Sequence, residues 1–312
     1  MKALVIGAAG FVGDYLMDYL QLQGYEVCVT KLNTDKKIGK AGIQEYDLNI
    51  LNPTAIQELL LAIKPDFIFH LAAQSSVEFS WKNPGLTVDV NIKGSLNVLE
   101  AVRRLSYKPR MLLIGSGEEY GYINESEVPI KETTACRPGN IYAATKVCQN
   151  MMGSIYSHAY QLELVMVRAF NHIGPKQSPK FVVSDFCKQV VEIEMGIKAP
   201  IIQVGNLNAK RDFTDVRDVV RAYLMLVEKG VAGETYNVGS GQAMAISDIL
   251  NMIIGQSKMS IIVDVEKERL RPSDVPIIEA DISKIVSQVG WKPVIGLEET
   301  IQDTLTYWRE NI

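Results

Sequence analysis

The chain has 312 residues, 47% of them hydrophobic and 22% charged, with a formal net charge of −4. These values are ordinary for a soluble globular protein, and the absence of a basic run argues against binding to nucleic acid. No apolar run approaches the ~20 residues of a membrane span, and the N-terminus lacks the apolar region and cleavage site of a signal peptide. We therefore expect a cytoplasmic protein. The histidines and cysteines are few and scattered, so no metal site is expected.

Apolar strands alternate with amphipathic helices through the first half of the chain, which predicts βαβ units in a parallel sheet. The strands are expected at 3–6, 25–30, 66–71, 110–114 and 162–168, and the helices from Val12 to Leu20 and over 85–104 and 141–160. Prolines and glycines in 171–212 predict loops with one helix inside. Further elements are expected at 215–229 (helix), 234–238 (strand) and 297–311 (helix).

Three glycines follow the first strand directly and open the first helix, with the spacing G-x-x-G-x-x-G. Gly7 allows a sharp turn, Gly10 lets backbone approach a pyrophosphate, and Gly13 lets the helix pack closely on the strand. The phosphates would lie at the N-terminus of the helix. A glycine-rich turn without a ligand is the alternative. The strand–loop–helix context favours a dinucleotide site that includes Phe11 and Val12.

We therefore expect an α/β fold: a Rossmann-type doubly wound parallel sheet with a smaller α/β C-terminal substrate lobe. Residues 1–170 would form the NAD(P)-binding domain, with returns near 205–240 and 276–290. Residues 171–312 would mainly form the substrate-binding lobe.

The choice between the two nicotinamide cofactors depends on the end of the second strand. NAD-binding folds usually carry an acid there, whereas this chain has Lys31, which suits a 2′-phosphate. NADP(H) is therefore preferred and NAD(H) stays possible. The alternative is that Lys31 is a solvated surface lysine. Asp47 and Leu48 follow a further short strand and could contact the adenine, although Asp47 could equally be an ordinary loop aspartate.

Tyr142 and Lys146 are four residues apart in a predicted helix and share one face. A lysine ammonium beside a tyrosine would lower the pKa of the phenol from its usual ~10 and make it a general acid or base near neutral pH. Ser116 follows the fifth strand, where active sites of open α/β sheets lie, and could bond a carbonyl oxygen.

With these motifs the chain resembles the extended short-chain dehydrogenase/reductase family over nearly its whole length. The matching stretches are GAAGFVG at 7–13, LAAQSS at 71–76, IGSGEEYG at 114–121 and YAATK at 142–146. The resemblance implies that Tyr142 is the acid/base, that Lys146 supports it and holds the nicotinamide ribose, and that Ser116 orients the carbonyl. It also assigns the first three residues of the second stretch, Leu71, Ala72 and Ala73, to the cofactor and Ser75 to the substrate.

Three further stretches, 171–172, 205–212 and 270–275, resemble GDP-mannose 4,6-dehydratases and their partner reductases. The resemblance implies that Arg211 and Arg271 hold a diphosphate, that Asp274 bonds the nucleoside, and that Asn171 contacts the substrate. Guanidinium groups suit this task because they make forked bonds to phosphate oxygens. The alternative is a pair of surface arginines in ion pairs with Asp212 or Asp274.

The triplet Ser116-Gly117-Glu118 bears on the reaction. Sugar 4,6-dehydratases resemble one another in a Thr-Asp-Glu or Thr-Ser-Glu triplet, and here the middle side chain is absent. The resemblance therefore implies NAD(P)H-dependent reduction of the C4 ketone of GDP-4-keto-6-deoxy-D-mannose to GDP-D-rhamnose, or to GDP-6-deoxy-D-talose by attack on the other face. Glu118, which could also be a solvated loop carboxylate, keeps GDP-mannose 4,6-dehydratase or another nucleotide-sugar dehydratase or epimerase open.

Two further expectations complete the sequence-based account. A non-catalytic NADP-sensing regulator is disfavoured because such proteins tend to lose the tyrosine or the lysine, and both are present here. A homodimer is expected, with the helices at 85–104 and 141–160 pairing with their twofold mates, as in the enzymes this chain resembles.

Overall fold

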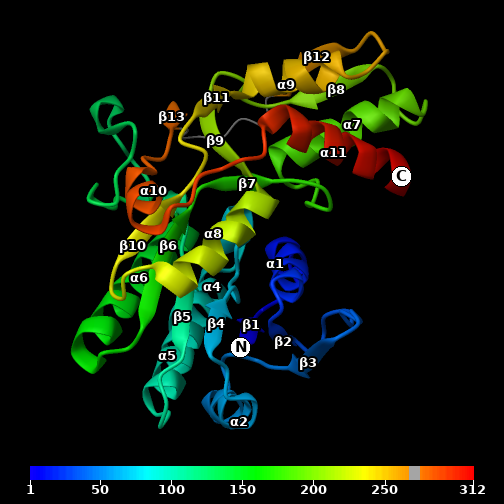
Figure 1. Cartoon of the computed structure of the whole chain (residues 1–312). Helices are drawn as coiled ribbons and strands as arrows, with labels where there is room; N and C mark the ends of the chain where they lie inside the picture. Colours follow the sequence, from blue (N-terminus) through cyan, green and yellow to red (C-terminus); the bar gives the residue numbers. More distant parts are fainter. Residues whose placement is uncertain (267–274) are drawn as a thin grey trace.

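A computed structural model describes residues 1–266 and 275–312 of the chain. The predicted substrate residues Arg271 and Asp274 lie outside the described residues. Figure 1 gives the arrangement of the elements in sequence colours.

Seven parallel strands form the central sheet, in the order β10-β6-β5-β4-β1-β2-β3. They are β1 (Lys2–Ile6), β2 (Glu26–Lys31), β3 (Ile43–Asp47), β4 (Phe67–His70), β5 (Arg110–Ile114), β6 (Leu164–Ala169) and β10 (Thr235–Val238). Val5 of β1 pairs with Val29 of β2 on one side and with Phe69 of β4 on the other, and all three are fully buried. Near-continuous apolar runs of this kind belong to strands covered on both faces. The predicted Rossmann-type sheet is confirmed.

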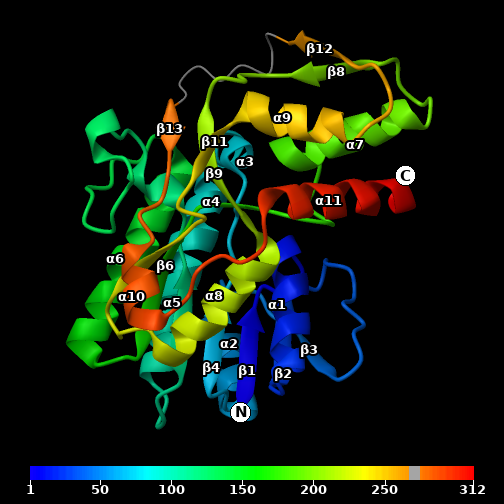
Figure 2. The ribbon, with the colours of Figure 1, turned by 45° about the horizontal axis from the view of Figure 1, so that its top comes forward.

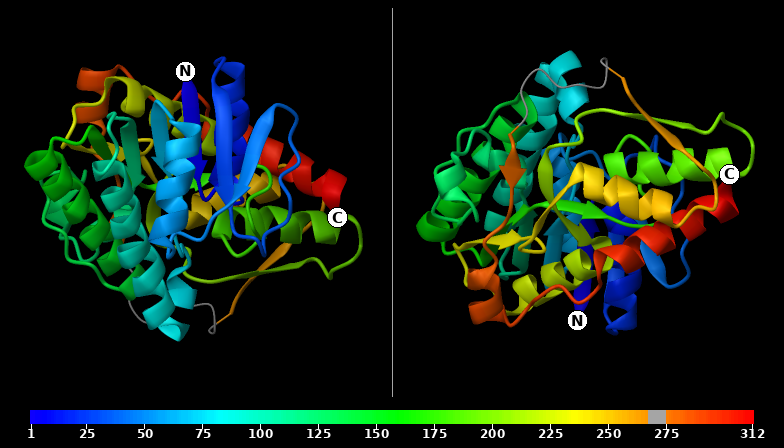
Figure 3. Two further views of the ribbon diagram at one scale, coloured as in Figure 1. Left: turned by 90° about the horizontal axis from the view of Figure 1, so that it is seen from below. Right: turned by 90° about the horizontal axis from the view of Figure 1, so that it is seen from above.

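Two layers of helices cover the sheet (Figure 3). One face packs against α1 (Phe11–Leu22), α8 (Val216–Lys229) and α10 (Ser283–Val289), and the other against α2 (Pro53–Ile63), α5 (Ser95–Arg103) and α6 (Ile141–Tyr160). Side-chain caps fix where two of these helices begin: Asn52 accepts from Ala55 N–H, and Asn140 accepts from Ala143 N–H. The sheet order reverses between β1 and β4, where ligands bind in open α/β folds.

The helix predicted over 85–104 is interrupted by a change of winding. Short helices α3 (Val77–Lys82) and α4 (Pro84–Val88) lead into a π-helical turn, Asp89–Gly94, and then into α5. π-turns inside helices often occur at functional sites. Asn91 in this turn is buried and bonds both Gln74, through N–H and C=O, and the hydroxyl of Thr145 on α6.

A second lobe lies beyond the carboxyl ends of the central strands (Figures 1 and 2). Its strands are β7 (Asn171–Ile173), β8 (Ile201–Val204), β9 (Lys210–Asp215), β11 (Ala243–Ala245), β12 (Ile262–Val265) and β13 (Ile277–Ile278), with β9 paired to β7, β11 and β13, and β8 to β12. Helices α7 (Val182–Glu194), α9 (Ile246–Gly255) and α11 (Leu297–Asn311) pack around a separate apolar core.

Two sequence-based expectations concern the chain from residue 171 onward: loops with one helix over 171–212, and a domain division at residue 170. The prediction of loops with one helix over 171–212 is wrong, because β7, β8 and part of β9 lie there together with α7. These strands have three to six residues, too few for a period-2 pattern to stand out. Past residue 170, α8, β10 and α10 pack with the central sheet, whereas β9 belongs to the lobe. The division into two domains at residue 170 stays a prediction.

Candidate active site

The glycine loop packs tightly against its surroundings at two of its three glycines. Gly7 has φ of +84°, and a Cβ there would lie 2.5 Å from the Cα of Ala72. The N–H of Gly7 donates to the carbonyl of Thr30 at 3.2 Å. A Cβ on Gly13 would lie 2.1 Å from the carbonyl oxygen of Ala8. Side chains are therefore excluded where the loop meets the segment after β4 and where α1 packs back on the loop, and a backbone hydrogen bond ties the loop to β2.

Gly10 differs from its two partners, because a Cβ there would meet nothing within 4 Å. Gly10 is the N-cap of α1, which begins at Phe11, and it has no side chain that could bond the first N–H groups of the helix. These N–H groups and the helix dipole offer an anion a place to bind. The loop thus has the open face and the donors that a dinucleotide pyrophosphate requires.

The segment after β4 borders this loop. The N–H groups of Leu71 and Ala72 both donate to the carbonyl of Ile6, at 2.9 and 2.8 Å. Ala73 is half-buried, and Ser75 is exposed. The structure therefore brings Leu71 and Ala72 beside the glycine loop and leaves Ser75 at the surface.

Lys31 lies in a polar cluster at the end of β2. Its ammonium is 2.6 Å from Asp47 Oδ1 and 3.7 Å from a carboxylate oxygen of Glu45, and its side chain is 8% exposed. The hydrogen bond with Asp47 raises the pKa of Lys31. The alternative of a solvated surface lysine is wrong. Asp47 ends β3 opposite Lys31, and Leu48, which is buried, donates its N–H to the Lys31 carbonyl.

Tyr142 and Lys146 lie one turn apart on α6, and both are buried. The Lys146 ammonium donates to the carbonyl of Ile114 at 2.7 Å and to Gln149 Oε1 at 3.1 Å. These acceptors use two of its three protons, which leaves one for another partner. Burial lowers the pKa of Lys146 to about 8.

The expected lowering of the pKa of Tyr142 is wrong for this structure. Burial raises the pKa of the phenol, and the interaction with the Ser116 side chain offsets only part of that rise. The Lys146 ammonium donates to Ile114 and Gln149. The desolvation of the phenolate therefore dominates, and Tyr142 keeps its proton near neutral pH.

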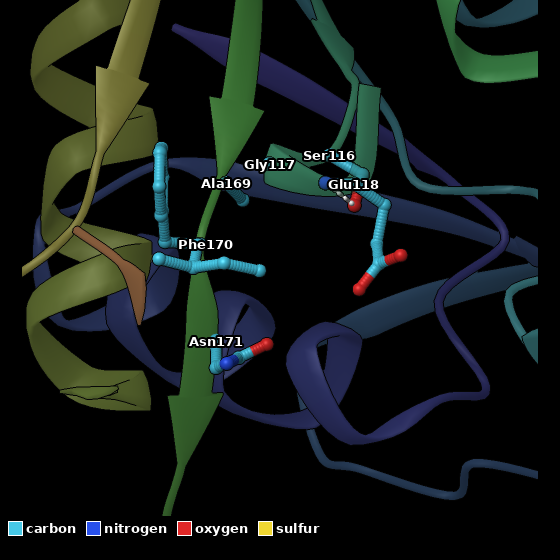
Figure 4. A pocket seen from close by; sticks show the side chains of 7 residues that line it. Ser116, Gly117, Glu118, Ala169, Phe170 and Asn171 are labelled. Atoms are coloured by element: carbon cyan, nitrogen blue, oxygen red, sulfur yellow. Dashed lines mark hydrogen bonds between the residues drawn. The ribbon is translucent and has the colours of Figure 1, made fainter. Parts of the chain in front are cut away.

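A cavity lies between the end of β5 and the start of β7 (Figure 4). Ser116 caps a 3₁₀ turn, Gly117–Tyr120, by accepting from the N–H of Glu118 at 3.2 Å. The Glu118 side chain is half-buried, extends toward the cavity and accepts from Asn140 Nδ2 at 3.2 Å. The lining residues are Ser116, Gly117, Glu118, Ala169, Phe170, Asn171 and Ile278. The side chains of Ser116, Glu118 and Asn171 therefore line one cavity at the carboxyl edge of the sheet.

Arg211 lies one strand away from this cavity. It pairs in register with Ile278, which lines the cavity, and its Nη1 donates to the Val275 carbonyl at 2.8 Å. Its neighbour Asp212 is fully buried and accepts the N–H of Ser240 at 2.6 Å, along with those of residues 241 and 280. Asp212 therefore anchors backbone at the base of the lobe.

The sequence-based search missed an ion pair beside the cavity between the buried Glu119 and the half-buried Arg168, which lie 2.9 Å apart. Nothing in the string EEYG distinguishes the glutamate that faces the cavity from the one that is buried.

Two kinds of feature are absent from the part of the chain that the structure describes. No helix there is long and apolar enough to cross a membrane, and no group of three or more His, Cys, Asp or Glu side chains could hold a metal ion.

The parallel sheet, the glycine loop and the Ser116–Tyr142–Lys146 group together define an extended short-chain dehydrogenase/reductase. Within that class, the chain belongs to the GDP-mannose 4,6 dehydratase family, whose family model matches residues 4–304. The family predicted from the sequence is confirmed. Membership also supports an NAD(P)-dependent nucleotide-sugar enzyme over a non-catalytic regulator.

Three full-length comparisons agree with this assignment. The GDP-6-deoxy-D-mannose reductase of Pseudomonas aeruginosa is 29% identical over 311 residues, covering 100% of this chain and 98% of the relative. The structure of RMD from Pseudomonas aeruginosa complexed with NADPH has a TM-score of 0.88 at 27% identity, covering 100% and 99% of the two chains. The Thermus thermophilus UDP-glucose 4-epimerase complex with NAD has a TM-score of 0.89 at 28% identity and covers both chains completely.

Proposed function

We propose that this enzyme uses NAD(P)H to reduce the C4 ketone of GDP-4-keto-6-deoxy-D-mannose to GDP-D-rhamnose. The observation that carries the proposal is that Ser116 lines the cavity while its side chain interacts with the buried phenol of Tyr142. Reduction of a ketone needs a proton donor for the developing alkoxide, and the phenol of Tyr142 carries its proton near neutral pH. Burial in this structure makes that phenol a weaker acid than a free tyrosine, so a bound substrate or cofactor has to favour the proton transfer. The full-length likeness to the Pseudomonas reductase supports the same reaction.

Each residue of the site has a task in this proposal. Tyr142 would donate the proton, and the hydroxyl of Ser116 would hold the ketone oxygen. Lys146 would donate a hydrogen bond to the nicotinamide ribose with its remaining N–H, while Ile114 and Gln149 fix its position. The bound nicotinamide would supply the hydride. Gly10 and the first N–H groups of α1 would hold the pyrophosphate.

We further propose that NADPH is preferred over NADH. Lys31 ends β2 where an acid would bond the ribose of NAD, and Lys36 and Lys37 follow on the exposed loop. The Pseudomonas structure that contains NADPH gives modest support, because the Thermus relative contains NAD. The Lys31–Asp47 bond would have to open for Lys31 to bind a 2′-phosphate.

The nucleotide of the substrate is proposed to be GDP, with Arg211 as one ligand of the diphosphate. Arg211 lies on β9, next to the strand that brings Ile278 to the cavity. Arg271 and Asp274 keep the predicted roles in the diphosphate and nucleoside sites. Asn171 extends toward the cavity and would contact the sugar (Figure 4).

One observation favours a second function, GDP-mannose 4,6-dehydratase. The Glu118 carboxylate extends into the same cavity as Ser116, in the place where a dehydratase needs a proton-handling group (Figure 4). Gly117 stands against this function because it supplies no polar side chain between the two. Glu118→Gln separates the functions: a reductase would keep most of its turnover, whereas a dehydratase would lose it.

The assay that tests the main proposal uses two substrates in parallel. With GDP-4-keto-6-deoxy-D-mannose, NADPH absorbance is expected to fall, and the NMR spectrum of the product identifies GDP-D-rhamnose or GDP-6-deoxy-D-talose. With GDP-mannose, no 4-keto product is expected. Formation of the 4-keto sugar from GDP-mannose, without NADPH oxidation on the keto substrate, would replace the reductase proposal with the dehydratase.

We also propose a homodimer formed through α6 and the helices beside it. Met151 and Ile155 on α6 are 61% and 57% exposed, and Leu86 and Val88 on the adjoining α4 are exposed as well. Large apolar side chains gathered on neighbouring helices favour a partner surface. Light scattering of the wild type should report a dimer and Ile155→Glu a monomer. Val294→Glu, at an exposed site away from these helices, is the control and should stay dimeric.

A further inference from the structure

Two adjacent glutamates face opposite ways beside the active site. Glu118 extends toward the cavity, whereas Glu119 is fully buried. The Oε1 of Glu119 accepts the N–H of Ser116 at 2.9 Å. Its Oε2 accepts hydrogen bonds from Nε–H of Arg168 at 2.9 Å and from Nδ2–H of Asn150 at 3.1 Å. A single carboxylate therefore connects the Ser116 turn to β6 and to α6.

The residues around this carboxylate leave space for it and fix the position of its partner Arg168. A Cβ on Gly115 would lie 2.2 Å from Oε1 of Glu119, so the backbone leaves room for the acid. Arg168 also donates to the Tyr120 hydroxyl and to the Glu132 carbonyl, both at 3.1 Å. A buried carboxylate is tolerated when it has a counter-charge and its hydrogen bonds are satisfied, as those of Glu119 are here.

The same carboxylate lies near Lys146: it packs against Gly115 and bonds Ser116, and the Lys146 ammonium donates to the carbonyl of the preceding residue, Ile114. The titratable groups that face Lys146 are Glu119 from the 3₁₀ turn, His70 from β4 and Tyr142 one helical turn earlier. Burial lowers the pKa of Lys146 to about 8, and the Glu119 carboxylate opposes that effect. Burial raises the pKa of Glu119 itself, while the Arg168 guanidinium and the Ser116 N–H favour its ionised form. His70 bears no charge near neutral pH, because burial lowers its pKa to about 3.

We propose that Glu119 is a positioning residue of this enzyme, which fixes the Ser116 turn against β6 and α6 and places a carboxylate near the Lys146 ammonium. It would touch neither substrate nor cofactor. The proposal rests on the function proposed above, because it takes the tasks of Ser116 and Lys146 from there. A merely structural ion pair would contribute to stability alone, so the two possibilities predict different results.

Glu119→Gln is the first test, because it removes the charge and keeps the shape. An amide has one acceptor oxygen and cannot serve Ser116, Arg168 and Asn150 together. We expect kcat to fall by roughly 10²-fold through displacement of Ser116, with little change in KM. The loss of negative charge should also move the titration of Lys146 to lower pH by about one unit.

The second readout needs no sugar nucleotide. Binding of the reduced nicotinamide nucleotide that the wild type takes up, NADPH or NADH, is followed by its fluorescence from mildly acidic to alkaline pH. Affinity should fall as Lys146 loses its proton, and it should fall at lower pH in Glu119→Gln. This arm reports on Glu119 even if the proposed sugar substrate is wrong.

Two further variants separate charge from architecture. Asp215→Asn breaks another ion pair of a buried carboxylate with a half-buried arginine, Arg217 at 2.7 Å, and should lower stability without moving the pH midpoint. The double variant Glu119→Gln/Asn150→Asp transposes amide and carboxylate between side chains in contact. It returns a negative charge to the cluster and should restore the pH midpoint.

If Glu119→Gln does not fold, Glu119→Asp carries the test. This variant keeps the charge and withdraws it from Ser116, so kcat should fall while the pH midpoint stays. The proposal is overturned if Glu119→Gln behaves like Asp215→Asn, with lower stability but unchanged kcat and midpoint. Wild-type kcat in Glu119→Asp, or a double variant whose midpoint stays at the Glu119→Gln value, overturns it as well.

Discussion

The two halves of the active site are built in different ways. On the cofactor side, the loop at 7–13 joins β1 directly to α1, and Tyr142 and Lys146 share one helix, so each functional group comes from one short stretch. On the substrate side, β9 is paired with β7, β11 and β13, which lie tens of residues away along the chain. The cofactor side therefore depends on local geometry, and the substrate side on long-range pairing.

The largest expected effect comes from removing the proton donor on the cofactor side, Tyr142. Tyr142→Phe should lose on the order of 10²–10⁴-fold in kcat, because loss of a general acid costs that much, while nicotinamide binding persists. Tyr107→Phe makes the same chemical change before β5, at the opposite edge of the sheet, where the hydroxyl donates to the Leu60 carbonyl, and it should keep wild-type turnover. Turnover within a few-fold of wild type in Tyr142→Phe would remove the phenol from the mechanism.

Arg211→Ala tests the substrate side. A lost charge-assisted bond costs ~1.5–3 kcal/mol, so GDP affinity should fall roughly ten- to a hundredfold and KM should rise with it. Cofactor affinity should not change. Calorimetric titration of GDP, UDP and NADPH into wild type and variant measures nucleotide affinity and cofactor affinity. Arg309→Ala, which breaks a surface ion pair with Glu194, is the control. Equal binding of GDP and UDP by wild type would contradict the guanine assignment.

The next prediction concerns the end of β2, where the cofactor side adjoins a strand from further along the chain. Lys31→Asp should lower the kcat/KM ratio of NADPH over NADH by about tenfold, since it replaces a cation with an acid near the ribose. Asp47→Asn should raise that ratio, because it releases the Lys31 ammonium. If neither variant changes the ratio, the 2′-phosphate binds elsewhere.

The smallest expected effect is a pH dependence that moves activity and stability in opposite directions. Lys146 has a folded-state pKa of about 8 against its usual 10.5, so kcat/KM should decline as pH rises through about 8. The unfolded chain binds more protons than the folded one between these values, so this group should make the free energy of unfolding rise with pH there. A kcat/KM that stays flat from pH 7 to about 9 would contradict a protonated Lys146.

Local patterns allowed the cofactor side to be predicted from the sequence. The strand-loop-helix with its glycines and the helix that carries Tyr142 and Lys146 both follow from spacing within a few residues. Three features could not be predicted in this way. The lobe strands need partners far along the chain, the Lys31–Asp47 bond needs the β2–β3 register, and the raised pKa of Tyr142 depends on burial.

Glu119 shows why one sequence leaves part of a site hidden. Its neighbour Glu118 has the same side chain, and only the 3₁₀ turn decides which of the two carboxylates meets Ser116, Arg168 and Asn150 inside the protein. Residues that act through others carry no chemical pattern of their own.

The central claim is that hydride passes to C4 of a GDP-linked keto sugar at this site. The measurement that tests it most directly uses reduced nicotinamide cofactor with deuterium at the transferable position, together with GDP-4-keto-6-deoxy-D-mannose. Mass spectrometry and NMR of the product should show one deuterium, at C4, and Tyr142→Phe should slow its appearance. A product without deuterium at C4, or no product while the cofactor is stably bound, would contradict the claim.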